Sequence, residues 1–365
     1  MAIPFLLTLP LQHPTMCQWQ TLESLCKCDP KFQPQTGQAC CRRPDSGARI
    51  MRHIPAQAIA LWTVLCSASF GDQTMKTLAD LRRPTPLKET FVYKSVGGRD
   101  LTLDVYPPGD AFPTQTCPAI IFIHGGGWRS GSSDHFAPHC RYFASRGMVA
   151  ANIMYRLAID TAPDRTAVSI FQCIADAQDA VRWVRRNARQ ISVDPDRIAV
   201  CGDSAGGHLA ACAGILPHPD TGKVEPECVP NAMILCNPVL DLVELDWTRG
   251  VPGIAGLPPD MQAREAERAS PLRHIRPGLP PALILHGTED KCVPVEQAAR
   301  FKRLMTEAGN KCISIAYKGV SHAFVLLDYY PDESAVLNAI VDIDNFLSGI
   351  GYLTGAPTLA GPRRQ

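Results

Sequence analysis

Gly202-Asp203-Ser204-Ala205-Gly206 is the stretch that decides the fold of this chain. An apolar run, residues 197–201, precedes it, and a run of small residues, 207–213, follows it. This order predicts a strand, a tight turn and a helix, with Ser204 held on the turn in strained backbone geometry. A bare G-x-S-x-G pattern is weak, but the flanking strand and helix make it a nucleophile elbow rather than a chance match.

A second glycine-rich turn predicts hydrogen-bond donors for a developing oxyanion. The buried-strand run 118–123 leads directly into His124-Gly125-Gly126-Gly127-Trp128. Consecutive glycines let backbone N–H groups point into a site. We assign the oxyanion contacts to the N–H groups of Gly126 and Gly127, with Ala205 N–H as the third donor. The alternative is a glycine-rich turn without a catalytic role.

An acidic residue follows another apolar strand. The apolar residues 281–285 predict a buried strand, and Asp290 lies five residues beyond its end. A carboxylate just past the carboxyl end of a parallel strand lies at the same sheet edge as the elbow. Glu289 competes for this role, but adjacent side chains do not both face one site. We favour Asp290 because it directly follows the turn.

The candidate base is His322, after the strand-like run 312–317. A lone histidine is more often structural, but this one completes the chain order Ser204, Asp290, His322, which is the order of α/β-hydrolases. Three further histidines lie inside motifs and are interpreted as holding loops by hydrogen bonds: His124, His208 and His286.

These motifs resemble the α/β-hydrolase superfamily, and within it the HGGG-type carboxylesterases of the hormone-sensitive-lipase-like and feruloyl-esterase-like group. The resemblance runs from roughly residue 90 to 350. It implies an α/β fold with a mostly parallel central sheet, helices on both faces and a short cap, and it implies no metal or organic cofactor. The chain departs from the family at Val320-Ser321-His322-Ala323-Phe324. The family usually has glycine before the histidine and a small residue after it, often as Ala-Gly-His-Gly-Phe.

The pattern of the chain after about residue 90 alternates strand and helix. A hairpin is expected from 91–95 and 101–106, and the clearest helix at 167–190. Later strands are expected to end at Ile123, Ile153, Cys201, Cys236, Leu285 and Tyr317. The hydrolase domain is placed at 85–350, with a cap insertion near 241–270 and a C-terminal tail at 351–365.

The N-terminal region has a different composition. Residues 1–50 contain five cysteines without metal-site spacing, so an upstream extension, not translated, is preferred over a metal or redox segment. Residues 51–71 have a basic start, a short apolar stretch and small residues, as in a signal peptide starting at Met51. A lipoprotein site at Cys66 is disfavoured by the large Leu65. The expected location is secreted or periplasmic, with the cytoplasm as the alternative.

Composition limits the possible partners. The chain has 365 residues, 45% hydrophobic and 19% charged, with a net charge of +1. A net charge this close to zero does not favour binding to nucleic acid. No later apolar run is long enough for a membrane span. Nine cysteines follow Cys66, and Cys117, Cys201 and Cys236 are expected to be buried. Oligomeric state and disulfide pairing stay open.

The combined prediction is a serine carboxylesterase for short-chain or small aromatic esters that works through an acyl-enzyme. Ser204 is the nucleophile, His322 the base and Asp290 the acid that orients it. A peptidase or arylformamidase with the same triad is one alternative. A non-catalytic binding protein that kept the fold is the other, and it is disfavoured because nucleophile and base are both present.

Overall fold

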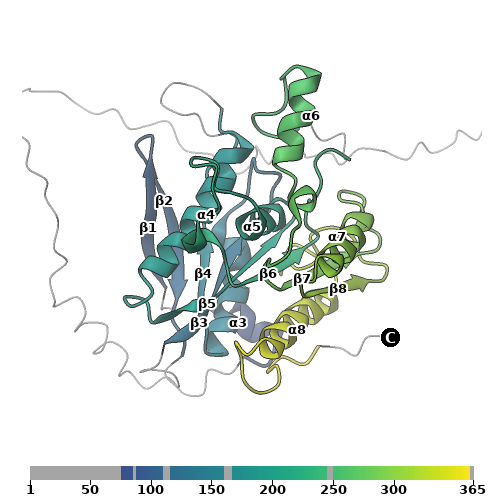
Figure 1. Ribbon diagram of the computed structural model, residues 1–365. Coiled ribbons are helices and arrows are strands. Elements are labelled where there is room, and N and C mark those ends of the chain that lie inside the picture. The colour runs from purple at the N-terminus through teal and green to yellow at the C-terminus, as the bar shows by residue number, and fades with distance from the viewer. Residues whose placement is uncertain (1–74, 85–87, 110–115, 160–166, 245–249, 362–365) are drawn as a thin grey trace, which may run out of the picture. The chain divides into compact units, whose positions relative to one another are not determined.

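An eight-stranded sheet organises the described part of the chain, in the order β1-β2-β4-β3-β5-β6-β7-β8 (Figure 1). Only β2 runs antiparallel to its neighbours, β1 and β4, and all other pairs are parallel. The strands are β1 Glu89–Val96, β2 Arg99–Tyr106, β3 Cys117–Ile123, β4 Val149–Ile153, β5 Val193–Asp203, β6 Ala232–Cys236, β7 Ala282–Gly287 and β8 Cys312–Tyr317. The predicted mostly parallel α/β fold is confirmed.

The computed structural model describes residues 75–84, 88–109, 116–159, 167–244 and 250–361. The chain divides into two units, residues 1–65 and 66–365, and every described residue belongs to the second. The predicted upstream extension and signal peptide lie outside the described residues.

Strand ends follow the predicted positions closely. β3, β4, β6 and β8 end where the apolar runs stop, while β5 and β7 continue two residues further, to Asp203 and Gly287. The hairpin of β1 and β2 turns at Gly97 and Gly98, both at positive φ (60° and 77°). Glycine is suited to both positions because side chains are disfavoured there.

Helices cover both faces of the sheet (Figure 1). Ile121 and Ile123 of β3 join one core cluster, whereas Ile120 and Phe122, which alternate with them, join the other. The first cluster contains α4 (Ile170–Arg186), α5 (Ala205–Ile215) and α7 (Val295–Glu307); the second contains α2 (Leu78–Arg82), α3 (Ala137–Ser145) and α8 (Glu333–Gly349). The remaining elements are α6 (Pro259–Arg268) and the short 3₁₀ helices η1 (Ser133–Phe136), η2 (Pro226–Cys228) and η4 (Pro271–His274).

Helix α4 is shorter than the predicted span 167–190 because its ends are set by specific contacts. Ser169 caps its N-terminus and forms a capping box with Gln172, so the helix starts at Ile170. The predicted apolar face is buried as expected: Ile170, Ile174, Ala177, Val181 and Val184.

Segments outside the predicted 85–350 range also pack against this core. Leu81 of α2 is buried, and so are Leu353 and Leu359 in the C-terminal segment. The Thr358 hydroxyl donates a hydrogen bond to Met75 O at 2.8 Å, which joins the two segments. Among the described helices, none has the length and apolar character needed to cross a membrane.

Candidate active site

Ser204 lies on a strained turn between β5 and α5. Its φ of 52° and ψ of −119° are sparsely populated by residues with a side chain. A Cβ on Gly202 would lie 2.3 Å from Gly206 O, and one on Gly206 would lie 2.0 Å from Ile123 O. Both glycines are therefore needed for the close approach of β5, α5 and β3. The predicted elbow geometry is present.

His322 links Ser204 to Asp290 through its two ring nitrogens. Nε2 lies 2.9 Å from Ser204 Oγ, and Nδ1 lies 2.7 Å from Asp290 Oδ2. An ionised carboxylate only accepts, so Nδ1–H donates to Asp290 and Nε2 accepts from the Ser204 hydroxyl. The Asp290 side chain is fully buried, and that of His322 is 18% exposed. The competing Glu289 is exposed. The acid that contacts His322 is therefore Asp290 and not Glu289.

Several donors surround the Asp290 carboxylate. Its Oδ1 accepts from the backbone N–H groups of Cys292 and Val293, at 2.8 and 2.9 Å. Oδ2 lies 3.2 Å from His286 Nε2. Burial alone raises the pKa of Asp290, but hydrogen bonds from His286 and His322 outweigh it and hold the pKa well below its usual range. Asp290 therefore stays ionised at neutral pH.

His286 was expected to hold a loop, and it also contacts the acid. Its Nε2 lies 3.0 Å from Val293 O as well as close to Asp290 Oδ2. This position fits one N–H shared between two acceptors. The sequence did not indicate the second contact, although a histidine four residues before the acid was a usable signal.

The glycine-rich turn after β3 has the backbone geometry that oxyanion donors need. Gly126 and Gly127 both have positive φ, 107° and 62°. The turn is closed by Arg129 N and Ser130 N, each 3.1 Å from Gly126 O. Within the described residues, no protein acceptor bonds the N–H groups of Gly126, Gly127 or Ala205. These three donors are available to a ligand oxygen.

Aromatic side chains fix this turn in place. The His124 ring stacks on Tyr155 at 4.4 Å, and the Tyr155 hydroxyl donates to His124 O at 3.0 Å. Trp128 is 2% exposed and packs edge-on against the His208 ring at 5.3 Å. His208 in turn bonds Ala269 O through Nε2 at 2.7 Å. Burial lowers the pKa of both His124 and His208 to about 4, so both are neutral at pH 7.

The loop that carries His322 explains the departure from the family pattern. Ala323 has a φ of 59°, where glycine is usual and alanine is strained. Ser321 is exposed, and its N–H donates to the Tyr330 hydroxyl at 3.0 Å. The small side chains of Ser321 and Ala323 are thus accommodated, and the histidine still reaches the site.

Asp203 is a buried acid that sequence reasoning passed over. It precedes the nucleophile, is 1% exposed, and no described donor reaches its Oδ1. A Cβ on Gly125 would lie 2.8 Å from its Oδ2, so the carboxylate packs directly on the glycine-rich turn. Burial raises the pKa of Asp203 to about 6. At neutral pH the fold therefore carries a poorly compensated charge beside Ser204.

Asp203→Asn should stabilise the fold at about pH 8 by about 3 kcal/mol. The native pKa, about 6, exceeds the model-peptide value of 3.8. The native state therefore binds the extra proton between these values, and stability from this group falls as the pH rises through them. The gain from asparagine should shrink toward about pH 4.5. Denaturant unfolding of both proteins at the two pH values checks this, and an equal difference at both would contradict it.

The cap differs from the core in polarity. Ala266 is the only fully buried residue of α6, and four of the five charged residues of that helix are exposed. Hydrogen bonds hold the cap against the core: Ile170 N donates to Pro252 O at 2.9 Å, and the Arg129 guanidinium donates to Gly250 O at 2.8 Å. Residues 245–249, which belong to the predicted cap, lie outside the described residues.

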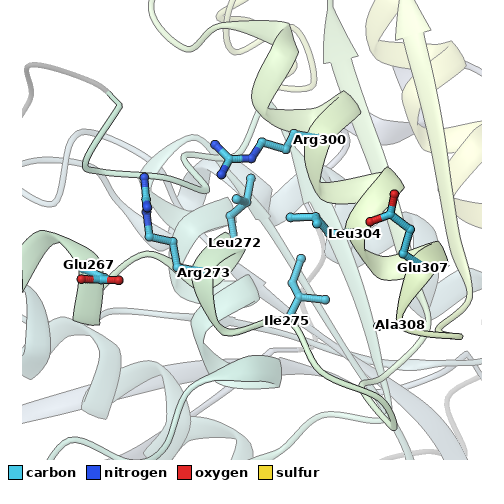
Figure 2. A pocket seen from close by; sticks show the side chains of 8 residues that line it. All are labelled: Glu267, Leu272, Arg273, Ile275, Arg300, Leu304, Glu307 and Ala308. Carbon is cyan, nitrogen blue, oxygen red and sulfur yellow. The ribbon is translucent and has the colours of Figure 1, made fainter.

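A cavity of about 480 Å³ lies beside the cap, between η4 and α7. Figure 2 shows its lining: Glu267, Leu272, Arg273, Ile275, Arg300, Leu304, Glu307 and Ala308. The two arginines already contact the buried Asp241, at 2.9 Å for Arg273 and 3.6 Å for Arg300. None of Ser204, Asp290 and His322 lines this cavity, so it is not the place where an ester would meet the serine.

Comparisons with known proteins agree with this geometry. The BD-FAE family model matches residues 103–305. The probable carboxylic ester hydrolase LipM of Mycobacterium tuberculosis is 28% identical over 316 residues, covering 80% of this chain and 69% of LipM. Esterase LipC of the same organism is 32% identical over 243 residues, covering 62% of this chain but only 57% of LipC.

Solved structures give a closer likeness. Esterase 2 of Thermogutta terrifontis, phosphoramylated by tabun, is 39% identical, with a TM-score of 0.65 over 75% of this chain and 98% of that one. The same esterase has been solved with propionate bound and with butyrate bound, each with a TM-score of 0.64. The fold, the site and these likenesses define an α/β-hydrolase carboxylesterase of the serine type. The chain belongs to the BD-FAE family, whose model covers more than half of it.

Proposed function

We propose that Ser204, His322 and Asp290 are the catalytic triad of this esterase. The observation that carries the proposal is the continuous hydrogen-bonded line from Ser204 Oγ through both nitrogens of His322 to Asp290 Oδ2, at 2.9 and 2.7 Å. In the first step, Ser204 Oγ attacks the ester carbonyl while His322 Nε2 takes its proton. Asp290 stays ionised, keeps the proton on Nδ1, and stabilises the imidazolium cation.

The N–H groups of Gly126, Gly127 and Ala205 receive the oxyanion of the tetrahedral intermediate. Their positions on two separate turns, one after β3 and one at the start of α5, suit donors that converge on one oxygen. The imidazolium then gives its proton to the leaving alcohol, and the acyl-enzyme forms. Water repeats the sequence with His322 as base, which releases the acid and the free serine.

The proposed substrates are short-chain or small aromatic esters. A lid that opens onto a lipid surface exposes a broad apolar face. Here α6 has charged outward residues, and Met261 is its one exposed large hydrophobic side chain. The related Thermogutta terrifontis esterase 2 binds propionate and butyrate. Both observations favour small acyl groups over long-chain triglycerides. Trp128, which follows the glycine donors, is buried in the core and packs against the His208 ring.

Activity on nitrophenyl esters should peak between acetyl and about hexanoyl and fall for longer chains. Each methylene that finds an apolar wall adds ~0.8 kcal/mol, and one that finds no room loses that or more. The check is kcat/KM across an acyl series from acetyl to palmitoyl, with feruloyl and acetylated-sugar esters beside it. A rise toward palmitoyl, with a jump in rate at an oil–water interface, would overturn the substrate class and leave the triad standing.

An amide counterpart distinguishes the remaining alternatives. A peptidase or arylformamidase would hydrolyse a nitroanilide or an N-formyl arylamine at a rate comparable with the matching ester. We expect the ester to be preferred by a large margin. Turnover of neither ester nor amide by the folded protein would point to a binding function.

We further propose that residues 51–71 are a signal peptide and that the mature enzyme is secreted or periplasmic. The basic start and the short apolar stretch support this, together with the small residues that follow. A chain beginning at Asp72 should keep esterase activity, because it retains Met75 and α2, which pack against the hydrolase core. Mass spectrometry of the protein from its native cell gives the true N-terminus. An uncleaved chain recovered from the cytoplasm would contradict the proposal.

A further inference from the structure

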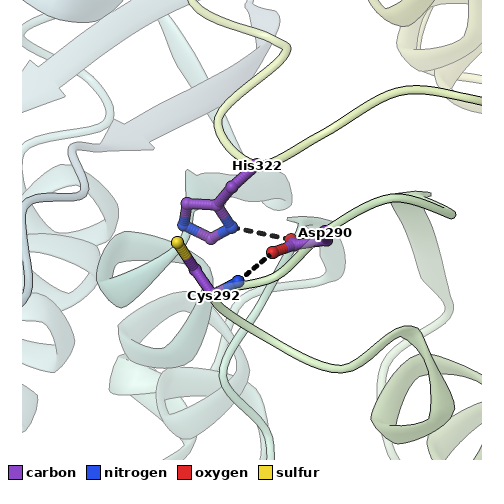
Figure 3. Close-up of side chains that lie close together, drawn as sticks. All are labelled: Asp290, Cys292 and His322. Carbon is purple, nitrogen blue, oxygen red and sulfur yellow. Dashed lines mark hydrogen bonds and ion pairs between the residues drawn. The ribbon is translucent and has the colours of Figure 1, made fainter. Parts of the chain in front are cut away.

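Cys292 occupies a special position among the cysteines of the described region. Of nine described cysteines, seven are buried, and only Cys292 and Cys312 are partly exposed. Cys292 lies two residues after Asp290, in the loop between β7 and α7. Figure 3 shows its sulfur beside the imidazole of His322, with the Asp290 carboxylate on the other side of the ring.

The three side chains form a possible ligand set for a metal ion. One donor atom from each of Asp290, Cys292 and His322 lies within 4.8 Å of the other two. Ligand atoms around tetrahedral zinc are separated by roughly 3.3–3.8 Å, given bond lengths of about 2.0–2.3 Å. Binding therefore requires the three side chains to adjust their donor separations to this range. Thiolate, imidazole and carboxylate together favour Zn²⁺ and similar borderline ions over Mg²⁺ or Ca²⁺.

We propose that Asp290, Cys292 and His322 form an inhibitory site for thiophilic divalent cations of the Zn²⁺ class. The Cys292 thiol releases its proton to solvent on binding and becomes a thiolate ligand. The imidazole supplies a ring nitrogen, the carboxylate one oxygen, and a water completes the tetrahedron. No electron transfer takes place, so the site forms and empties reversibly.

Occupation of this site stops hydrolysis because both nitrogens of His322 already serve the triad. The Asp290 carboxylate lies on the Nδ1 side of the ring, so a cation shared by the two residues binds Nδ1 and replaces the proton that now bridges Nδ1 and Oδ2 at 2.7 Å. The displaced proton moves to Nε2, which then cannot accept the proton of the Ser204 hydroxyl, 2.9 Å away. Occupation therefore removes two hydrogen bonds that the proposed mechanism needs. The inhibition rests on the proposed role of His322, whereas the metal binding does not.

Cobalt provides a test that is independent of activity. Co²⁺ bound by a thiolate gives a charge-transfer absorption in the near ultraviolet, which is lost when the sulfur ligand is removed. The full-length chain should show this band, and Cys292→Ser should reduce it by one thiolate equivalent. Cys312→Ser, the matched control at the other partly exposed cysteine, should keep it. Ser204→Ala should keep it too, because the proposed ligands do not include the serine.

Inhibition by zinc provides the second test. For each protein the inhibition constant is measured against its own uninhibited rate on nitrophenyl acetate. Cys292→Ser should weaken Zn²⁺ inhibition by at least about 30-fold, and Cys312→Ser should leave it within about 3-fold. Mg²⁺ at the same concentration should not inhibit. Equal inhibition and an equal cobalt band with and without the Cys292 sulfur would overturn the site. A band that depends on Cys292 without any inhibition would uphold the site and count against the proposed role of His322 instead.

Discussion

Ser204→Ala should lower kcat by about 10⁴-fold or more, with the fold intact. The hydroxyl is the atom that forms the covalent acyl bond, and His322 and Asp290 have no other described nucleophile oxygen in line with them. Some rate above that in water should survive, because the donors at Gly126, Gly127 and Ala205 still stabilise an oxyanion. Steady-state kinetics on nitrophenyl acetate measure the loss, and circular dichroism with thermal unfolding checks the fold.

A matched serine controls for general damage near the site. Ser321→Ala changes an exposed serine beside His322 and keeps the backbone N–H that bonds Tyr330. Its kcat should stay within about 3-fold of the parent. A fluorophosphonate should label the parent and Ser321→Ala once, and should not label Ser204→Ala. Near-normal turnover in Ser204→Ala, or labelling at another serine, would show that the nucleophile has been misassigned.

The sequence predicted the fold because its signals are local and repeat along the chain. The inner parallel strands β3, β6 and β7 are rich in apolar residues, since both of their faces are buried. The predicted ends at Ile123, Ile153, Cys236 and Tyr317 match the structure to the residue. These ends also locate the site, because functional loops follow the carboxyl ends of parallel strands.

Contacts across loops could not be predicted in the same way. The sequence favoured Asp290 over Glu289 only because Asp290 directly follows the turn, and the structure adds a stronger reason. Backbone N–H groups of Cys292 and Val293 bond Asp290 Oδ1, so the chain folds back around the carboxylate. That fold brings Cys292 beside His322. Side-chain direction in such a turn depends on tertiary contacts that no local pattern encodes.

The contacts of buried polar side chains were also not predicted from the sequence. Asp203 and His286 lie at strand ends inside motifs, where a sequence shows their presence but not their partners. The structure gives Asp203 an unpaired Oδ1 against Gly125, and gives His286 a contact with Asp290 at 3.2 Å. The pKa values of the two buried acids shift in opposite directions because their hydrogen-bond partners differ. Asp203, with no described donor, has a raised pKa, and Asp290, with several donors, has a lowered pKa.

Asp290→Asn should lower kcat by about 10³- to 10⁴-fold with little change in KM. The carboxylate only accepts, so it selects the tautomer of His322 with the proton on Nδ1 and leaves Nε2 free to take the proton of Ser204. An amide can donate to Nδ1 and thereby select the other tautomer, with Nε2 protonated and unable to act as a base. The amide also removes the negative charge that stabilises the imidazolium cation.

Glu289→Gln is the matched control, because it removes the adjacent exposed acid and leaves the hydrogen-bonded line untouched. Its kcat should stay within about 3-fold of the parent. The loss of kcat in Asp290→Asn should also shrink at high pH, because hydroxide in solution then replaces His322 as the base. The rate is therefore measured from about pH 6 to pH 10 for both variants. A loss confined to Glu289→Gln would assign the orienting acid to Glu289. Comparable losses in the two variants would show that Asp290 is not the sole orienting acid, and either result would contradict the triad as proposed.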